Sequence, residues 1–265
     1  GLDSLAKTLL IEELLITRID INDPYSLSKK IKKFVFKQLR YSKDTWFVLH
    51  EDNLWKPVRE PLAIIQEVIT VGLKNNSVKL CKEINTSDPD KPVSEIKALM
   101  SCFKTTSSSS FMGQVKKYLM TFLCDDKFVN KLDKNKYAIA YKNGIWNIRM
   151  NKFREGIYPE DYLTKTLDFD YVEGRNLVEE DYIKSKFWGI ANRNDEHYSF
   201  LMSVLGYAMS GDSDRYQNFY SWIGQRAGNG KSTIFDVLEQ SFPQYVGNVD
   251  SKIIELDCKV FHKLI

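Results

Sequence analysis

Cysteine and histidine are scarce in this sequence, with four and three residues among 265. The cysteines lie far apart, form no CxxC pair and have no histidine nearby at zinc spacing: Cys81, Cys102, Cys124 and Cys258. We therefore expect neither a disulfide framework nor a zinc site. The cysteines are more typical of the reduced thiols of an intracellular protein. The three histidines do not cluster, so none is assigned a role.

Long hydrophobic runs and a strong net charge are also missing. No apolar run approaches the roughly 18 to 20 residues of a membrane span, and the N-terminus lacks a basic region followed by an apolar core. We therefore expect no membrane partner. Because the net charge is only +3, from 38 basic and 35 acidic residues, any nucleic-acid surface must be a local patch. With 43% hydrophobic residues, the chain is expected to be globular.

A length of 265 residues exceeds the usual domain size of about 100 to 200 residues, which favours two units. The chain begins at Gly1 rather than at Met and stops at "KVFHKLI" without a cap or a polar tail. We interpret it as a fragment of a longer protein.

Apolar spacing predicts mostly helix in the first half. One amphipathic helix is expected from Asp3 to about Asn22. The next, in "SLSKKIKKFVFKQLR", is the most basic stretch and places these apolar residues on one face: Leu27, Ile31, Phe34, Val35 and Leu39. A hairpin is expected around residues 51–53. Helices follow at about 61–74 and around 96–103, and the "TTSSSS" tract at 105–110 is interpreted as a flexible inter-helix loop.

The second half contains a predicted hairpin in "YAIAYKNGIWNIR", with Asn143-Gly144 in a type I′ turn. An irregular arm and two helices, at about 179–190 and 195–209, follow. The second helix is expected to place these residues in the core: Phe200, Leu201, Leu205, Tyr207 and Met209. A short strand in "QNFYSWIG", a glycine-rich turn and a helix in "STIFDVLEQSF" come last.

That strand-loop-helix order is the context of a P-loop. Unpaired backbone N–H groups and the helix dipole favour a triphosphate at a helix N-terminus. The predicted ATP-binding residues are Gly228, Asn229, Gly230, Lys231, Ser232 and Thr233. The glycines free the loop backbone, Lys231 reaches the β and γ phosphates, and Ser232 is the candidate ligand of Mg²⁺.

The loop departs from the pattern GxxxxGK[ST] at its first glycine. Gln225 stands at that position and Gly224 lies one place earlier, so the loop is one residue longer or shifted in register. Hydrolysis would also need an acidic motif on a second strand. The sole candidate, Glu255 and Asp257 in "KIIELDCK", is more typical of a solvated turn, so no catalytic residue is assigned in this chain.

The segment "YKNGIWNIRMNKFREGIYPEDYLTKTLDFDY" and the later "NGKST" resemble the poxvirus-type primase-helicases, whose core is a superfamily 3 helicase. Asn147 is a slight departure from the family's pattern, in which an aspartate often stands at this position after the hairpin. The resemblance implies an α+β chain. A mainly helical N-terminal domain with short β-hairpins would precede the start of an α/β P-loop (AAA+) core. The implied division is a helix or linker at 1–24, a collar-like helicase-associated domain at 25–210 and a truncated ATPase core at 211–265.

The resemblance further implies a viral or mobile-element replicative helicase in the host cytoplasm or nucleus. Its remaining ATPase motifs and arginine finger would lie beyond Ile265, and its primase domain before Gly1. It would act on single-stranded or forked DNA and self-associate into a ring, with a hexamer expected. The candidate phosphate contacts are Lys29, Lys30, Lys32, Lys33, Lys37, Arg40, Lys116 and Lys117. The candidates for base stacking are Trp46, Trp55 and Trp146.

Two other functions stay open on the sequence. One is a structural collar or adaptor that binds single-stranded DNA or partner subunits without nucleotide turnover, in which case the basic stretch matters and the P-loop is a remnant. The other is a P-loop ATPase of DNA packaging or partition, which the Pro-Glu-Asp-Tyr segment at 159–162 argues against.

Overall fold

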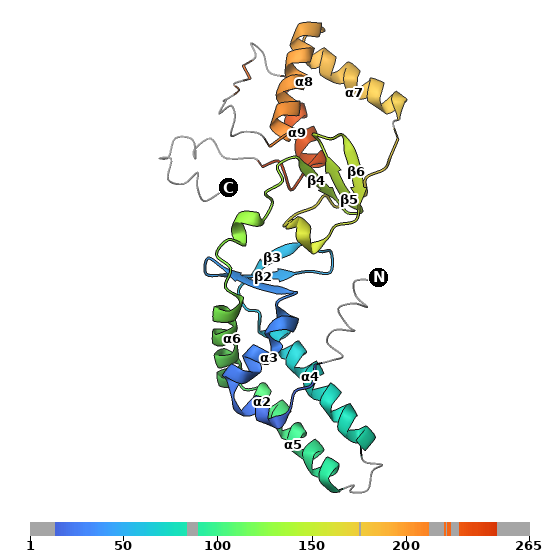
Figure 1. The fold of residues 1–265 in the computed structure, drawn as a ribbon. Coiled ribbons are helices and arrows are strands. Elements are labelled where there is room, and N and C mark those ends of the chain that lie inside the picture. Colours follow the sequence, from blue (N-terminus) through green and yellow to red (C-terminus); the bar gives the residue numbers. More distant parts are fainter. Residues whose placement is uncertain are drawn as a thin grey trace. The chain divides into compact units, whose positions relative to one another are not determined.

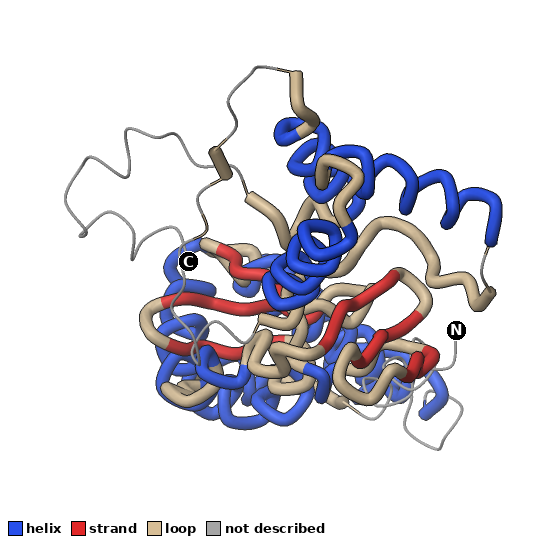
Figure 2. Tube along the Cα trace, turned by 90° about the horizontal axis from the view of Figure 1, so that it is seen from above, coloured by secondary structure: helices blue, strands red, loops and turns tan. Residues whose placement is uncertain are grey.

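The computed structural model describes residues 14–83, 90–174, 176–211, 220, 222–223 and 228–247. These residues form two compact units (Figure 1). Unit 1 holds the described residues up to Lys134 together with Tyr158–Thr164, and unit 2 holds Asn135–Ile157 and the described residues from Lys165 onward. Figure 2 shows that the described residues contain both helices, in blue, and strands, in red. The predicted α+β class is confirmed for these residues.

Unit 1 combines helices with one small antiparallel sheet. Its elements are α2 (Arg18–Asn22), α3 (Pro24–Val35), β1 (Leu39–Ser42), β2 (Thr45–Leu49), β3 (Trp55–Val58), α4 (Leu62–Glu83), α5 (Asp90–Thr106), α6 (Ser109–Leu123) and the 3₁₀ turns η1 (Val129–Lys131) and η2 (Pro159–Asp161). Strand β2 is central: it pairs with β1 and with β3, so the hairpin expected around residues 51–53 is confirmed and gains a third strand.

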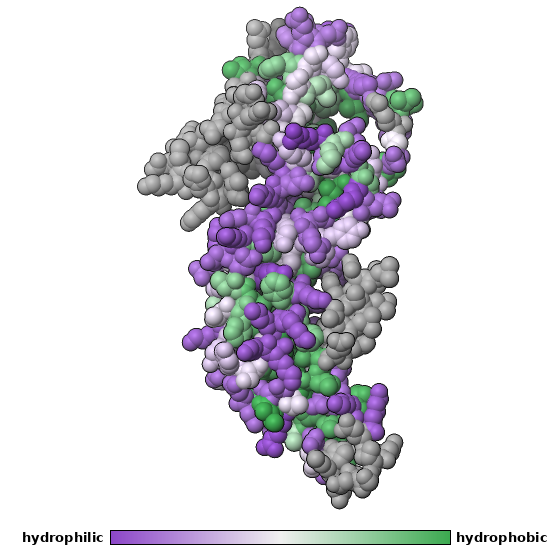
Figure 3. Space-filling model, viewed as in Figure 1, coloured by the Kyte–Doolittle hydropathy of each residue, from purple (hydrophilic) through white to green (hydrophobic). Residues whose placement is uncertain are grey.

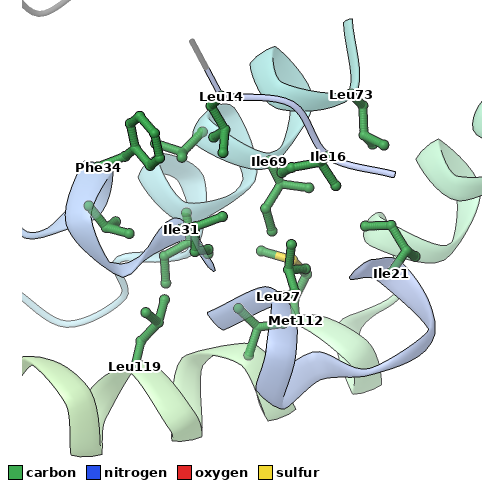
Figure 4. Close-up of a cluster of buried hydrophobic side chains, with 14 of the residues drawn as sticks. Leu14, Ile16, Ile21, Leu27, Ile31, Phe34, Ile69, Leu73, Met112 and Leu119 are labelled. Carbon is green, nitrogen blue, oxygen red and sulfur yellow. The ribbon is translucent and has the colours of Figure 1, made fainter. Parts of the chain in front are cut away.

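The core of unit 1 lies between α3, α4 and α6 (Figure 4). Leu27 and Ile31 of α3 are fully buried, as their shared helical face predicts. The segment from Leu14 to Thr17 is not helical, so the helix expected from Asp3 to Asn22 is wrong over these residues. It lies against α4, where Ile16 N donates to Gly72 O at 3.1 Å, and a Cβ on Gly72 would lie 2.7 Å from Ile16. Residues 1–13 lie outside the described part.

The structure corrects two expectations about helix ends in unit 1. Helix α3 ends at Val35, and Leu39 belongs to β1, because the strand pairing of Leu39 with Val48 replaces the next helical turn. The "TTSSSS" tract does separate two helices, but the break is confined to residues 107 and 108, because α5 continues to Thr106 and α6 begins at Ser109. At this end of α5 the hydroxyl groups of Thr106 and Ser107 both donate to Phe103 O, so local side-chain bonds accompany the end of the helix.

Unit 2 contains a second three-stranded antiparallel sheet and three helices. Its elements are β4 (Ala138–Tyr141), β5 (Gly144–Asn147), β6 (Lys152–Glu155), α7 (Leu177–Ile190), α8 (Asp195–Met209) and α9 (Lys231–Ser241). Strand β5 is central, between β4 and β6. The helices expected at about 179–190 and 195–209 are therefore confirmed as α7 and α8. No helix among the residues described is long and apolar enough to cross a membrane.

The second hairpin is confirmed, but its predicted turn is not. Tyr141 pairs with Gly144, so the two turn residues are Lys142 and Asn143, and none of Lys142, Asn143 and Gly144 has a positive φ. Gly144 is needed for another reason: a Cβ there would collide with the backbone oxygen of Arg154 in β6. The side chain of Asn143 bonds both backbone groups of Tyr171 in the arm, at 2.9 and 2.8 Å.

Helix α8 buries less than its sequence suggests. Leu205 is 8% exposed, whereas Phe200 is 65% and Met209 38% exposed, so the placement of these two in the core is wrong. The spacing of apolar residues predicts which of them share a face of the helix. It does not predict which of them another element covers. Of the strand expected at 217–224, only Tyr220, Trp222 and Ile223 are described, and these three are not in a strand. The α/β core therefore stays a prediction.

Candidate nucleotide site

The glycine-rich loop leads directly into helix α9. Gly228 and Gly230 have φ angles of 77° and 80°, in the left-handed region that favours glycine, and Gly230 is the residue that precedes the helix. The first turn of α9 has no acidic residue. The backbone N–H groups of Lys231, Ser232 and Thr233 therefore belong to a first helical turn that carries no carboxylate, which favours an anion.

Apolar contacts hold this loop in unit 2. Ile234 is 1% exposed and anchors the first turn of α9. A Cβ on Gly230 would lie 2.5 Å from Cγ1 of Ile190 at the end of α7, so only glycine fits there without a shift. The side chains of Ser232 and Thr233 are exposed. The ammonium group of Lys231 turns back and donates to Asn229 Oδ1 at 2.7 Å.

A pocket of about 310 Å³ opens beside the loop, and Asn229 and Lys231 form part of its wall. Aromatic and aliphatic side chains make up most of the rest, among them Phe200, Leu201 and Trp222, with His197 as a polar member. A mostly apolar pocket with a few polar groups is the usual form of a small-molecule site. Its volume lies near the lower end of the usual range for such sites, and it adjoins the glycine-rich loop.

No sequence pattern indicated this pocket. His197 and Phe200 lie in the first turns of α8, about thirty residues before the loop, and Trp222 precedes the loop. Phe200, which was predicted to lie in the core, is exposed and is one of the side chains that line this pocket. No spacing rule links α8 to the loop, so only the fold brings them together.

Several predicted features fall outside the described residues: Gly224, Gln225, Glu255 and Asp257. The register of the loop before Gly228 and the acidic candidate therefore remain predictions. Within the described ranges, no group of three or more His, Cys, Asp or Glu side chains is placed to hold a metal ion.

The predicted phosphate contacts lie in unit 1 and differ in exposure and in their partners. Most of these lysines are exposed: Lys29, Lys30, Lys32 and Lys33 of α3, Lys37 just after α3, and Lys117 of α6. Lys30 is paired with Asp20 at 2.7 Å and Lys116 with Glu60 at 2.7 Å. Arg40 instead packs on aromatic rings, with its guanidinium 3.6 Å from the ring centre of Phe36, and burial lowers its pKa. Arg40 therefore contributes to packing in unit 1.

The predicted stacking tryptophans are mostly buried. Trp46 and Trp55 are 3% and 2% exposed, so as base-stacking residues they are wrong choices. Large aromatic side chains bury more apolar surface than most residues, and the small sheet of unit 1 uses both for its packing. Trp146 is half-buried and stacks on Tyr171, with ring centres 5.0 Å apart.

Comparison with known proteins places the chain in a family. The family described as "D5 N terminal like" matches residues 28–224, well over half of the chain. The chain therefore belongs to this family, which confirms the resemblance to the D5-like primase-helicases. The matched segment ends before Gly228, so the family match does not include the glycine-rich loop before α9.

Two viral relatives support the same family. The "Putative helicase L207/L206" of Acanthamoeba polyphaga mimivirus is 21% identical over 231 residues, which cover 84% of this chain and 23% of the relative. The "Putative helicase 184R" of Invertebrate iridescent virus 6 is 25% identical over 151 residues, which cover 56% of this chain and 15% of the relative. The chain thus spans less than a quarter of either relative.

Proposed function

We propose that this chain is the ATP-binding part of a D5-type replicative DNA helicase, with Gly228–Thr233 as its phosphate loop. The observation that carries the proposal is the loop itself, with two glycines at positive φ immediately before helix α9. The family and the names of the two viral relatives support the helicase assignment.

Each residue of the loop has a distinct part in binding. The N–H groups of the first turn of α9 donate to phosphate oxygens, and Lys231 exchanges its bond to Asn229 for the β and γ phosphates. The exposed hydroxyl of Ser232 suits a Mg²⁺ ligand. The ion neutralises phosphate charge when bound. The adenine and ribose occupy the pocket that Phe200 and Trp222 line.

Unwinding requires more than a phosphate loop. An acidic motif that orients water and an arginine from a neighbouring subunit complete such ATPases. We therefore propose that the whole protein forms a ring, expected to be a hexamer, that binds ATP between subunits and acts on DNA. The chain alone should bind ATP and turn it over very slowly.

Equilibrium binding of a fluorescent ATP analogue with Mg²⁺ tests the loop. We expect Lys231→Ala to weaken binding at least tenfold, about 1.4 kcal/mol. Lys152→Ala, which removes an exposed lysine of β6 in the same unit, is the matched control and should bind like the native chain. Circular dichroism checks that all three are folded. If the two variants bind alike, the loop is a turn and the proposal fails.

A second variant tests the pocket apart from the loop. Phe200→Ala removes an aromatic wall but leaves the phosphate loop intact. It should lower the affinity for the ATP analogue about threefold or more, in line with the removal of one aromatic ring. Competition by inorganic tripolyphosphate, which has no base, should stay unchanged. An equal loss of affinity for both ligands would place the base elsewhere.

A further inference from the structure

Helices α3 and α6 of unit 1 pack against each other and carry charge of one sign. Their 12 and 15 residues include six lysines and no Asp or Glu. Lys30 and Lys116 are neutralised by Asp20 and Glu60. The remaining four have no carboxylate within ion-pair distance among the residues described: Lys29, Lys32, Lys33 and Lys117. The pair of helices therefore has an uncompensated positive surface.

Aromatic side chains lie within this positive surface. Tyr25, Lys29, Lys32 and Phe36 follow each other at helical spacing, which puts them on one face of α3 and its C-terminal cap. Tyr25 is 46% and Phe36 44% exposed. On the face of unit 1 visible in Figure 3, hydrophobic residues likewise appear as spots among hydrophilic ones.

Helix α6 extends this face with two more rings. Tyr25 meets Tyr118 edge to face, with ring centres 5.4 Å apart, and Phe122 at 5.5 Å. Lys32 Nζ lies 5.7 Å from the ring centre of Phe122, so cation and ring are neighbours across the two helices. An edge-to-face pair covers only one face of one ring, and Tyr118 is 38% exposed. Flat aromatic surface thus remains open to solvent.

We propose that this aromatic-basic face binds single-stranded DNA. Its members are Tyr25, Lys29, Lys32, Phe36, Tyr118 and Phe122. Single strands expose both a charged backbone and unstacked bases, and their binding proteins combine cations for the phosphates with aromatic rings for the bases. Lys29 and Lys32 contact phosphates, and the tyrosines stack on bases. A duplex hides its base faces and would use only the lysines.

The proposal rests on the proposed function in one respect, since a helicase must hold DNA. Its site nevertheless lies in unit 1, whereas the phosphate loop lies in unit 2. Binding of DNA without nucleotide therefore tests it independently. Lys231→Ala should bind DNA like the native chain, so failure of one proposal is distinguishable from failure of the other.

The experiment measures fluorescence anisotropy of a labelled 20-nucleotide oligo-dT over a range of salt concentrations. Lys29→Gln/Lys32→Gln should weaken binding and reduce the slope of log K against log salt by about 1.4, or about 0.7 for each phosphate that is no longer neutralised. The matched control is Lys97→Gln/Lys104→Gln, which removes two exposed lysines of α5 in the same unit and should leave the slope unchanged.

The aromatic part is tested by two matched pairs. Tyr25→Leu/Tyr118→Leu keeps apolar contact with Phe122 but removes flat rings, and should weaken binding about fivefold or more without a change in salt slope. Tyr25→Phe/Tyr118→Phe keeps the rings and should bind like the native chain. The proposal is overturned if the Leu pair binds normally, if the α5 control loses as much affinity as the α3 pair, or if a 20-base-pair duplex binds more tightly than the single strand.

Discussion

The indole Nε1 of Trp55 donates a hydrogen bond to the backbone oxygen of Pro159, 3.1 Å away. The backbone N–H of Trp55 also donates to Leu163 O at 2.8 Å. Trp55 thus holds the segment that returns to unit 1 after residues 135–157 have formed part of unit 2. The Pro-Glu-Asp-Tyr stretch, among the most specific parts of the resemblance, therefore has a structural role in this chain.

Shortening the Trp55 side chain tests that role. Trp55→Phe keeps an aromatic ring but leaves Pro159 O without its donor, and should lower the free energy of unfolding of unit 1 by about 1 to 2 kcal/mol. Trp55→Ala should cost about 3 to 5 kcal/mol, because it also removes a fully buried ring. Urea denaturation followed by circular dichroism measures both. A Phe variant as stable as the native chain would show that the hydrogen bond contributes nothing net.

Substitution of two glycines by alanine should change stability in opposite directions. Gly144→Ala drives a methyl group into the backbone of β6 and should destabilise unit 2 by about 1 to 3 kcal/mol. Gly113→Ala, in the interior of α6, meets no atom within 4 Å and should stabilise unit 1 by about 0.5 to 1 kcal/mol. Thermal unfolding of the two variants provides the comparison. Equal shifts of the same sign would contradict the packing described for Gly144.

Asp20 should make stability depend on acid pH. Burial acts to raise its pKa, but hydrogen bonds from Lys30 and Thr17 outweigh this, and the pKa is lowered. A lowered pKa in the folded state stabilises at pH above the unfolded value, about 3.9, and this contribution is lost as pH falls through the folded value. Asp20→Asn should therefore cost about 1 kcal/mol at pH 7, because the neutral amide can still accept from Thr17 N but loses the charged contact with Lys30.

The difference between Asp20→Asn and the native chain should shrink below about pH 4 as the native carboxylate takes up a proton. Asp168→Asn, at an exposed position of unit 2, is the control and should change stability by less than about 0.5 kcal/mol at either pH. Urea denaturation at pH 7 and pH 3 gives the four values. A stability gap for Asp20→Asn that persists unchanged at pH 3 would rule out the charged contact.

The thiols should react in a fixed order. Cys81 and Cys124 are exposed, whereas Cys102 is buried. Burial raises the pKa of Cys102, and burial with the neighbouring charge of Asp126 raises that of Cys124. Because the thiolate is the reactive form, Cys81 should react first with a disulfide reagent at pH 7.5, Cys124 more slowly and Cys102 upon unfolding.

Single Cys→Ser variants, made in a Cys258→Ser background, assign each kinetic phase of this reaction. The number of thiols that react in guanidinium should equal the number of cysteines left in each variant. Native-state reaction of Cys102 at the rate of Cys81 would contradict the burial of Cys102 in the core of unit 1.

Local pattern was a sufficient guide to most helices and to both hairpins. Leu27 and Ile31 of α3 are buried, as their spacing predicts. Helix α8 ends at Met209, the residue at which the sequence pattern places its end. The errors lie where two local patterns compete. Leu39 continues the helical period of α3 yet pairs with Val48, since the adjacent strand β2 satisfies its backbone.

By itself, the sequence determined the α+β class, the resemblance to D5-like primase-helicases and the loop Gly228–Thr233, because helical period, turn residues and phosphate-loop spacing are local properties. Only the tertiary structure decided which side chains are covered. It buried Trp46 and Trp55, left Tyr25 and Tyr118 exposed beside lysines, and brought Phe200 to the same pocket as Asn229 and Lys231. Exposure and proximity depend on which elements pack together, and contacts between residues far apart in the chain leave no periodic signal in it.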